Sequence, residues 1–487
     1  MIYFVLIFAF ILRLPLLNGS FWLDEAAQFL ESARPLSQQL LIKDDFQPPL
    51  MHLLTFFSIR LGSLFGLERA EWWLRFLPSL LPGIITIWAT YKLGLKLFNR
   101  KTALWASLFL TTSSFHIFYS QELRPYSLPA LFAILATWQM LEMLTSKQKK
   151  PICLFTIFSV FGLYSSYLYP FILLGQFIYL IYKKFNFKKN LIIAGTLILS
   201  FLPWLPKFLE QLGAGQALRV SMPGWEKVVS LPQLKTAMLI PLKFVFGVSD
   251  LQLNFSYIFL ALAIFLPLSY LLYLALKEKN KHLSFFLCLL VLPLLISWLV
   301  SFFVPVLQAK RVLFLLPIFA LLEAFLMTTY QKKHPNIIKI FLTSILIINL
   351  FSTFAYWNKP KLQRENWRAL NQEIAEKFPK DGTALVFSFS QPFASFEFYN
   401  QNTYKTFSTG VYYTNQLENP AEIFKNLADY RYVLVFDYLR DLTDPDDIVL
   451  KTVQDLGFKP AGVLDYPNIG FVRIYSRSSV ALINKKI

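Results

Sequence analysis

The sequence predicts a polytopic α-helical membrane protein with a small soluble domain at its C-terminal end. The first observation is the composition, because only 16% of the 487 residues are charged and 55% are hydrophobic, with a mean hydropathy of +0.48. A soluble chain of this length needs far more surface charge. The second observation is that apolar stretches alternate with short basic clusters, and the third is a change to mixed composition after about Pro360.

Apolar stretches suited to membrane helices recur through the first 358 residues, and a spanning helix needs about 20 mostly apolar residues. On this criterion we expect about eleven transmembrane helices. The first is expected to be a retained anchor, because it lacks a basic leading segment and Arg13 interrupts its apolar run. The eleven expected spans lie near residues 1–18, 73–92, 102–118, 126–144, 151–166, 168–182, 190–206, 256–276, 283–303, 312–329 and 336–356.

The net charge of +18 is explained by membrane topology, so no nucleic acid is needed as a partner. Five basic clusters each follow an even-numbered span, and the positive-inside rule places such clusters in the cytoplasm. The N-terminus is then cytoplasmic, and the loops 19–72 and 207–255 and the tail are extracytoplasmic. The clusters are Lys92/Lys96/Arg100/Lys101, Lys147/Lys149/Lys150, Lys183/Lys184/Lys188/Lys189, Lys277/Lys279/Lys281 and Lys332/Lys333.

The chain is expected to divide into a transmembrane domain over residues 1–358 and a soluble extracytoplasmic α/β domain over 359–487. In the first outer loop, helical patches are predicted at 31–41 and 50–64. The tail alternates helical patterns with short β-branched and aromatic runs, which is typical of a small α/β domain. Helices are expected at 365–378, 419–427 and 446–456, and strands at 383–389, 432–436 and 471–475.

Polar residues are dense at the predicted outer ends of the spans. Because ionisable groups at membrane depth are costly, several of them on one side indicate a polar cavity. The acidic pair Asp24-Glu25 follows the first span among aromatic residues, where a poorly solvated carboxylate is able to move protons. The remaining groups are Asp44 to His52, Arg75, Gln121 to Tyr126 with Glu122 and Arg124, and Lys310-Arg311.

Such a cavity suits the transfer of a sugar from a lipid phosphate. The leaving group would be a phosphate, which needs neutralisation by cations, and arginine offers bidentate contacts to it. The acceptor hydroxyl needs a general base within hydrogen-bond reach, and a carboxylate serves this role.

Three ordered motifs carry a family resemblance: Asp24-Glu25, then Gln47-Pro48-Pro49-Leu50-Met51-His52, then Ser120-Gln121-Glu122-Leu123-Arg124-Pro125-Tyr126-Ser127-Leu128. Together they resemble the polyprenyl-phosphate-dependent glycosyltransferases of the GT-C superfamily, specifically the family 39 and protein-mannosyltransferase-like group that includes aminoarabinose transferases. Arg311 resembles that group's Arg-aromatic-aliphatic-Pro segment, although Val312 replaces the aromatic residue. Asn366-Trp367-Arg368 resembles the start of its C-terminal domain.

The resemblance implies an inverting transfer with Asp24 as the base and Glu25 as its neighbour. It implies donor-phosphate contacts from Arg124 and Arg311, and we extend the candidate phosphate-binding set by position to Arg75, Glu122, Tyr126 and Lys310. His52 is a candidate substrate contact. The implied partners are a polyprenyl-phosphate sugar and a lipid, glycan or protein acceptor in the plasma membrane.

Competing interpretations remain open at this stage. Asp24-Glu25 also fits a juxtamembrane acidic pair within an interfacial aromatic belt. A transporter or flippase of lipid-linked sugars is the alternative function, although it predicts midplane polar residues and repeat symmetry. A receptor that presents the tail is a third. No cofactor is predicted with certainty; no metal-ligand spacing occurs, but acids near His52 leave a divalent cation open.

Overall fold

The computed structural model describes residues 1–42, 45–222, 224, 233–249, 255–401, 403–418 and 420–477. The chain forms two compact units. The helical unit comprises Met1–Asn18, Pro35–Leu209 and Leu231–Leu362. The sheet unit comprises Gly19–Arg34, Glu210–Ser230 and Gln363–Ile487. The segment that carries Asp24 and Glu25 therefore belongs to the same unit as the C-terminal tail.

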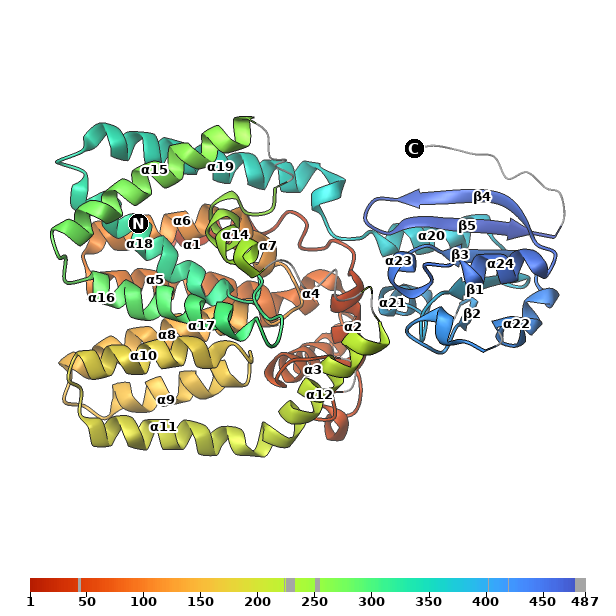
Figure 1. The fold of residues 1–487 in the computed structure, drawn as a ribbon, viewed down its shortest axis with the longest axis horizontal. Coiled ribbons are helices and arrows are strands. Elements are labelled where there is room, and N and C mark those ends of the chain that lie inside the picture. Colours follow the sequence, from red (N-terminus) through yellow and green to blue (C-terminus); the bar gives the residue numbers. More distant parts are fainter. Residues whose placement is uncertain are drawn as a thin grey trace. The chain divides into compact units, whose positions relative to one another are not determined.

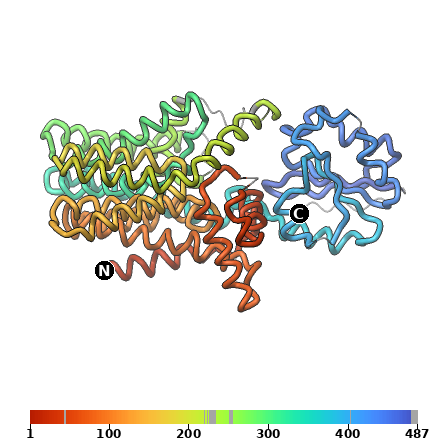
Figure 2. The backbone as a smooth tube through the Cα atoms, turned by 90° about the horizontal axis from the view of Figure 1, so that it is seen from below, coloured from red at the N-terminus to blue at the C-terminus, as the bar shows by residue number. Residues whose placement is uncertain are grey.

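The helical unit is built from helices that run side by side along a common direction (Figures 1 and 2). Two of them contain one π-helical turn, at Phe76–Leu80 and Leu287–Val291. The helices are α1 (Ile2–Ile11), α3 (Leu50–Ser63), α4 (Glu71–Arg75), α5 (Leu81–Leu97), α6 (Arg100–Thr112), α7 (Ser114–Ser120), α8 (Ser127–Thr145), α9 (Lys150–Leu163), α10 (Tyr169–Tyr182), α11 (Phe187–Phe201), α12 (Leu205–Ser221, which continues into the sheet unit), α14 (Gln233–Phe246), α15 (Phe255–Lys277), α16 (Leu283–Phe286), α17 (Leu292–Val300), α18 (Leu316–Tyr330) and α19 (Pro335–Asn358).

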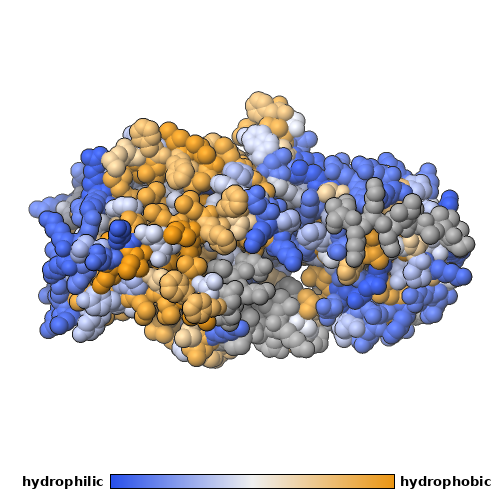
Figure 3. Space-filling model, turned by 90° about the horizontal axis from the view of Figure 1, so that it is seen from above, coloured by the Kyte–Doolittle hydropathy of each residue, from blue (hydrophilic) through white to orange (hydrophobic). Residues whose placement is uncertain are grey.

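Within the described residues, six helical stretches are long and apolar enough to cross a membrane, and the helical unit is that of a multi-pass membrane protein. Each predicted span overlaps a helix, but the total of about eleven stays a prediction because several of these helices are short. Large apolar side chains are exposed on α15 and α19, as an acyl-chain environment requires, and Figure 3 shows an apolar surface over this unit. The six stretches are Ser127–Thr145, Phe187–Leu218, Phe255–Lys277, Leu283–Val300, Leu313–Tyr330 and Pro335–Asn358.

The first predicted span, 1–18, is helical only as far as Ile11. Arg13 is fully buried, and its Nη1 donates to the carbonyl of Ala9 at 2.8 Å and to that of Thr111 at 3.3 Å. The guanidinium thereby satisfies one carbonyl near the C-terminal end of α1 and one near the C-terminal end of α6, where helical N–H donors are no longer available. A helix of ten residues is about 15 Å long, so α1 alone is too short to cross the hydrocarbon core.

The five basic clusters lie at loops that meet at one end of the helical unit. Phe98, in the α5–α6 loop, has its ring 4.9 Å from that of His282, which precedes α16. Burial, and then the charges of Lys281 and of Lys183 after α10, lower the pKa of the same imidazole. Lys96 pairs with Glu142 of α8 at 2.9 Å, and Lys333, after α18, pairs with Glu278 at 2.9 Å. The basic loops, which follow every second predicted span, therefore share one end of the helical unit, as the charge pattern predicted.

The sheet unit contains a five-stranded mixed sheet in the order β2-β1-β3-β5-β4. β1 is parallel to β2 and β3, whereas β5 is antiparallel to β3 and β4. All residues of β1 and β3 are buried, as expected for central strands covered on both faces. The strands are β1 (Thr383–Phe387), β2 (Lys405–Ser408), β3 (Tyr432–Phe436), β4 (Lys459–Tyr466) and β5 (Gly470–Ser476).

Helices cover both faces of this sheet and form two apolar cores. Trp367 and Leu370 of α20 and Phe396 of α21 pack in one core. Leu427 of the 3-10 helix Lys425–Asp429 and Val449 of α24 pack in the other. The helices of this unit are α2 (Leu23–Ser32), α20 (Trp367–Lys377), α21 (Ala394–Asn400), α22 (Pro420–Ile423), α23 (Arg440–Thr443) and α24 (Ile448–Asp455).

Several predicted elements require correction. The predicted helical patch 31–41 is wrong: α2 ends at Ser32, and only a 3-10 turn at Leu36–Gln38 follows, because Pro35 cannot continue a helix. The predicted helix 419–427 is two short helices, and β2, β4 and α21 were not predicted. The predicted outer loop 207–255 contains α12 and α14, and part of it lies outside the described residues.

Gly175 offers a test of helix packing in the helical unit. A Cβ at Gly175 of α10 would overlap the backbone oxygen of Cys288, so Gly175→Ala forces the helices apart. We expect a loss of about 1–3 kcal/mol in thermal unfolding in detergent. Gly195→Ala of α11 is the matched control, since nothing lies within 4 Å of its Cβ position. Equal stability of the two variants would contradict this packing.

Candidate active site

The acidic pair lies in the first turn of α2, an amphipathic ten-residue helix of the sheet unit. Carboxylates are favoured there because the first turn presents unpaired backbone N–H groups and the positive end of the helix dipole. Asp24 is partly exposed, whereas Glu25 is fully buried. Arg364, which precedes α20, has its Nε 3.6 Å from Glu25 Oε2. Glu25 is therefore neutralised within the sheet unit, and Asp24 is the more exposed of the two carboxylates.

In the helical unit, Arg124 forms a bidentate ion pair with Asp45. Nη1 lies 2.6 Å from Oδ2 and Nη2 lies 3.2 Å from Oδ1, and both side chains are 12% exposed. Burial alone would raise the pKa of Asp45, but the charge and hydrogen bonds of Arg124 outweigh burial and lower this pKa below its usual value. Asp45 therefore stays ionised and holds the guanidinium plane in one orientation.

His52 lies beside the same carboxylate. It is at the start of α3, its Nε2 is 3.9 Å from Asp45 Oδ2, and the side-chain nitrogen of Gln47 is 3.0 Å from the same Nε2. Tyr167, between α9 and α10, is close enough to Asp45 that, added to burial, the charge helps to raise the pKa of its hydroxyl to about 12. The Gln47–His52 motif and the Arg124 motif thus form one polar cluster. The sequence predicted only that the two motifs lie on the same side of the membrane.

Lys310 and Tyr126 are also brought together. The Nζ of Lys310, in the segment between α17 and α18, lies 5.8 Å from the centre of the Tyr126 ring, within the range of a cation–π contact. Arg311 donates through Nη1 to the carbonyl of Pro305 at 3.1 Å. Because Tyr126 precedes α8 and the basic loop 146–149 follows it, this cationic cluster is at the opposite end of the helical unit from the five basic loops.

Two predicted residues have backbone roles. Arg75, fully buried at the end of α4, donates through Nη1 to the carbonyl of Leu17 at 2.8 Å. The backbone carbonyl of Glu122 accepts a hydrogen bond from Ser79, and the Glu122 side chain is buried. The neighbouring Gln121 donates to the carbonyl of Arg13 at 2.7 Å. Arg75 and Gln121 thus hold the chain between α1 and residue 18, whereas Glu122 holds Ser79 of the π-helical turn.

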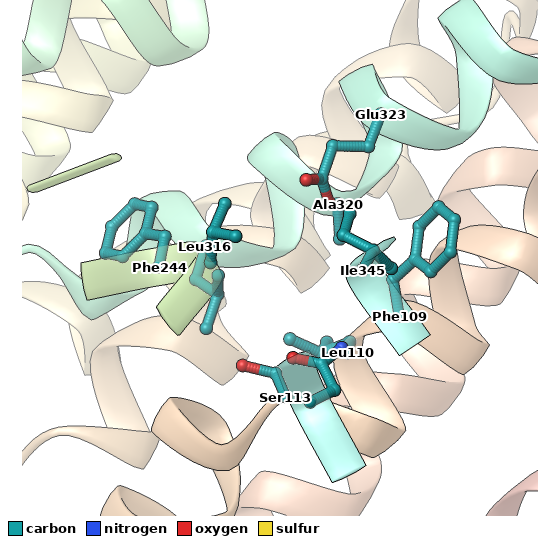
Figure 4. Close-up of a pocket in the computed structure, with 10 residues that line it drawn as sticks. Phe109, Leu110, Ser113, Phe244, Leu316, Ala320, Glu323 and Ile345 are labelled. Atoms are coloured by element: carbon teal, nitrogen blue, oxygen red, sulfur yellow. The ribbon is translucent and has the colours of Figure 1, made fainter. Parts of the chain in front are cut away.

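A buried cavity inside the helical unit is a separate feature. Glu323 of α18 and Ser113, between α6 and α7, face it (Figure 4), and Asn349 of α19 also lines it. Its volume is about 20 Å³, enough for about one water molecule. A sugar does not fit, so this cavity is not a substrate site.

Among the described residues, no group of three or more His, Cys, Asp or Glu side chains is close enough to hold a metal ion. The residue that sequence reasoning missed is Glu365, which lies directly before the Asn366-Trp367-Arg368 motif. Its carboxylate accepts hydrogen bonds from Trp367 Nε1 at 2.6 Å and Tyr438 Oη at 2.7 Å. The only sequence signal was its position next to a recognised motif.

The comparisons with known proteins agree on the fold. Residues 47–208, about a third of the chain, match the family described as dolichyl-phosphate-mannose-protein mannosyltransferase. No curated protein sequence matches the chain.

Three solved structures, of two proteins, are similar over nearly the whole chain. ArnT from Cupriavidus metallidurans in the apo state has a TM-score of 0.55 at 11% identity, covering 99% of this chain and 98% of that one. The same protein bound to undecaprenyl phosphate has a TM-score of 0.54 at 10% identity, with the same coverage. The archaeal oligosaccharyltransferase AglB from Archaeoglobus fulgidus, in complex with an inhibitory peptide and a dolichol-phosphate, has a TM-score of 0.52 at 12% identity, covering 98% of this chain and 74% of that one.

The chain thus has the fold of GT-C glycosyltransferases, which confirms the fold that the sequence motifs implied. At these identities the similarity establishes the fold, whereas the reaction and its residues rest on the chemistry of this chain.

The Asp45–Arg124 pair predicts a pH-dependent contribution to stability. Because the pKa of Asp45 is lowered on folding, the contribution is present above the unfolded pKa of about 4 and is lost as pH falls through the lower folded value. We expect Asp45→Asn to cost about 1.5–3 kcal/mol at pH 7 and much less at pH 3, by thermal unfolding in detergent. Asp381→Asn, at an exposed acid, is the control. An equal cost at both pH values would contradict the pairing.

Proposed function

We propose that this chain is an integral-membrane glycosyltransferase that moves a sugar from a polyprenyl-phosphate donor to an acceptor hydroxyl, with inversion, at the extracytoplasmic membrane face. The observation that carries the proposal is the convergence of Arg124, Tyr126 and Lys310 at one end of the helical unit. In support, two structures of this fold contain dolichol-phosphate or undecaprenyl phosphate.

The cationic cluster suits a phosphate leaving group. As the bond between the anomeric carbon and the phosphate oxygen breaks, the electron pair stays on that oxygen, and the polyprenyl phosphate gains negative charge. Arg124, Lys310 and Arg311 supply positive charge for this oxygen. The bidentate pair with Asp45 holds the plane of the Arg124 guanidinium in one orientation. Arg75, Glu122 and His52 are assigned supporting roles in holding the loops and contacting substrate.

Asp24 is assigned as the general base. The acceptor oxygen forms the new bond to the anomeric carbon on the face opposite the phosphate, which inverts the configuration, and its proton passes to the Asp24 carboxylate. Glu25, paired with Arg364, is assigned to holding α2 rather than to taking the proton.

Topology follows from the charge pattern. We assign the five basic loops and the N-terminus to the cytoplasm of a plasma membrane, and the cationic cluster and residues 359–487 to the extracytoplasmic side. We assign residues 359–487 to the soluble domain and the residues before them to the transmembrane domain. Residues 19–34 are assigned to the soluble domain as well, because their contacts group them with residues 363–487.

A divalent cation next to His52 stays a prediction. Transfer measured after chelation, and again after adding back Mg²⁺ or Mn²⁺, tests it: loss and recovery of activity support a bound cation.

The base assignment predicts the effect of Asp24→Asn. We expect sugar transfer from a polyprenyl-phosphate donor by purified protein in lipid to fall at least 10²-fold, because the variant lacks the proton acceptor. Asp455→Asn, at an exposed acid of α24, is the matched control. Wild-type transfer by the Asp24 variant would refute the assignment, and donor translocation without any transfer by wild type would favour a flippase.

The phosphate assignment predicts the effect of Lys310→Gln. Loss of one cation from the phosphate site should raise the KM for the lipid donor about 10-fold, equivalent to about 1.4 kcal/mol. Lys339→Gln, at an exposed lysine of α19 near the five basic loops, should leave this KM unchanged. A KM that responds equally to both substitutions would show a general charge effect instead.

A further inference from the structure

The segment that carries Asp24 is bound to the sheet unit by a set of specific contacts. The Phe21 N–H donates to Tyr399 Oη at 2.8 Å, and the Arg368 N–H donates to Ser20 Oγ at 3.1 Å. The Phe398 ring of α21 lies 5.1 Å from the Phe21 ring and 4.8 Å from the Phe29 ring. Residues on both sides of Asp24 are therefore fixed by residues that follow it by more than 340 positions.

Glu365 provides the contact nearest to Asp24. In addition to its bonds from Trp367 and Tyr438, its carboxylate has the backbone N–H of Leu23, the residue before Asp24, within reach as a third donor. The Leu23 side chain packs against the apolar core that contains Trp367 and Tyr438. Glu365 is only 9% exposed, Tyr438 is equally buried, and Trp367 is fully buried. The three donors come from α2, α20 and the end of β3, so one carboxylate joins three elements.

The chemistry of this contact favours an ionised carboxylate. Two oxygens with four lone-pair sites accept three hydrogen bonds, whereas a protonated carboxyl is itself a donor and accepts fewer. Burial, and then the nearby charge of Asp24, raise the pKa of Glu365 to about 7, although the three donors oppose this rise. The charged or titratable groups that face it are Asp24 from α2 and Tyr438 from the end of β3.

We propose that Glu365 is a positioning residue for the acid motif, holding the start of α2 through Leu23 so that the Asp24 carboxylate is presented in one orientation. The catalytic part of this proposal rests on the proposed function, whereas the holding of α2 does not. An ionised Glu365 makes all three contacts. The rate of sugar transfer therefore depends on the ionised fraction of Glu365 and also requires Asp24.

The test compares Glu365→Gln with wild type by two measurements on the full-length protein in lipid nanodiscs. The first is transfer from a polyprenyl-phosphate sugar at pH 6 and pH 8. Wild type should rise about 9-fold, because the ionised fraction of a carboxyl with a pKa of about 7 rises from roughly a tenth to roughly nine-tenths. Glu365→Gln should show at least 10-fold lower kcat at pH 8, an unchanged donor KM and no such rise with pH.

The second measurement is hydrogen–deuterium exchange of residues 20–30. We expect Glu365→Gln to speed exchange there at least 10-fold at pH 8, because a glutamine has a single acceptor oxygen for three donors. Glu376→Gln, at an exposed acid of α20, is the matched control. Tyr438→Phe removes one donor to the carboxylate, so it should move the midpoint of the pH–rate curve above 7 while leaving the protein folded.

Two results would overturn the proposal: a pH–rate rise in Glu365→Gln equal to that of wild type, or exchange of residues 20–30 in Glu365→Gln that is no faster than in wild type. Absence of transfer by wild type with every lipid-phosphate donor tested would overturn the proposed function instead. The exchange measurement would then still decide whether Glu365 holds the start of α2.

Discussion

The cost of leaving a polar group unsatisfied in an apolar surrounding governs where this molecule places its charge. Helices satisfy their own backbone groups, so the long apolar segments require nothing from their neighbours. Where helices end or break, carbonyls are left over, and buried cationic or amide side chains bind them: Arg13 at Ala9, Arg75 at Leu17 and Gln121 at Arg13. The connection that leads from α1 toward the acid motif is held in this way.

The same cost separates two kinds of charge along the helical unit. Solvated lysines gather at the five loops of one end, where their ammonium groups remain in water. At the other end, Arg124 is largely buried and is compensated by Asp45, while Lys310 lies over the ring of Tyr126. Cations that are held in fixed directions by protein groups, instead of by water, are those suited to meet a developing phosphate charge.

The carboxylates of the acid motif are compensated differently, because they belong to the sheet unit, which has apolar cores like those of soluble proteins. Glu25 is neutralised by Arg364, and Glu365 is surrounded by three donors, so Asp24 is the carboxylate of this group that is left partly exposed. Much of the candidate site could be predicted, since Asp24, Arg124 and Arg311 lie in short motifs of characteristic residue types. The Asp45–Arg124 pair and the Lys310–Tyr126 contact could not, because each joins segments 79 or more residues apart.

The sequence by itself determined the class of protein, the helical segments and the central strands, because apolar length and β-branched runs act locally and strongly. It also determined that five basic loops share one end, because charge alternation follows from the order of the spans. Only the tertiary structure decided that α1 stops at Ile11, that Asp24 and Glu25 lie inside a separate helix, and that this helix belongs with residues 363–487. The physical reason is that these outcomes depend on hydrogen bonds and ring packing between distant residues, such as Phe21 with Tyr399 and Leu23 with Glu365, which leave no periodic mark on the sequence.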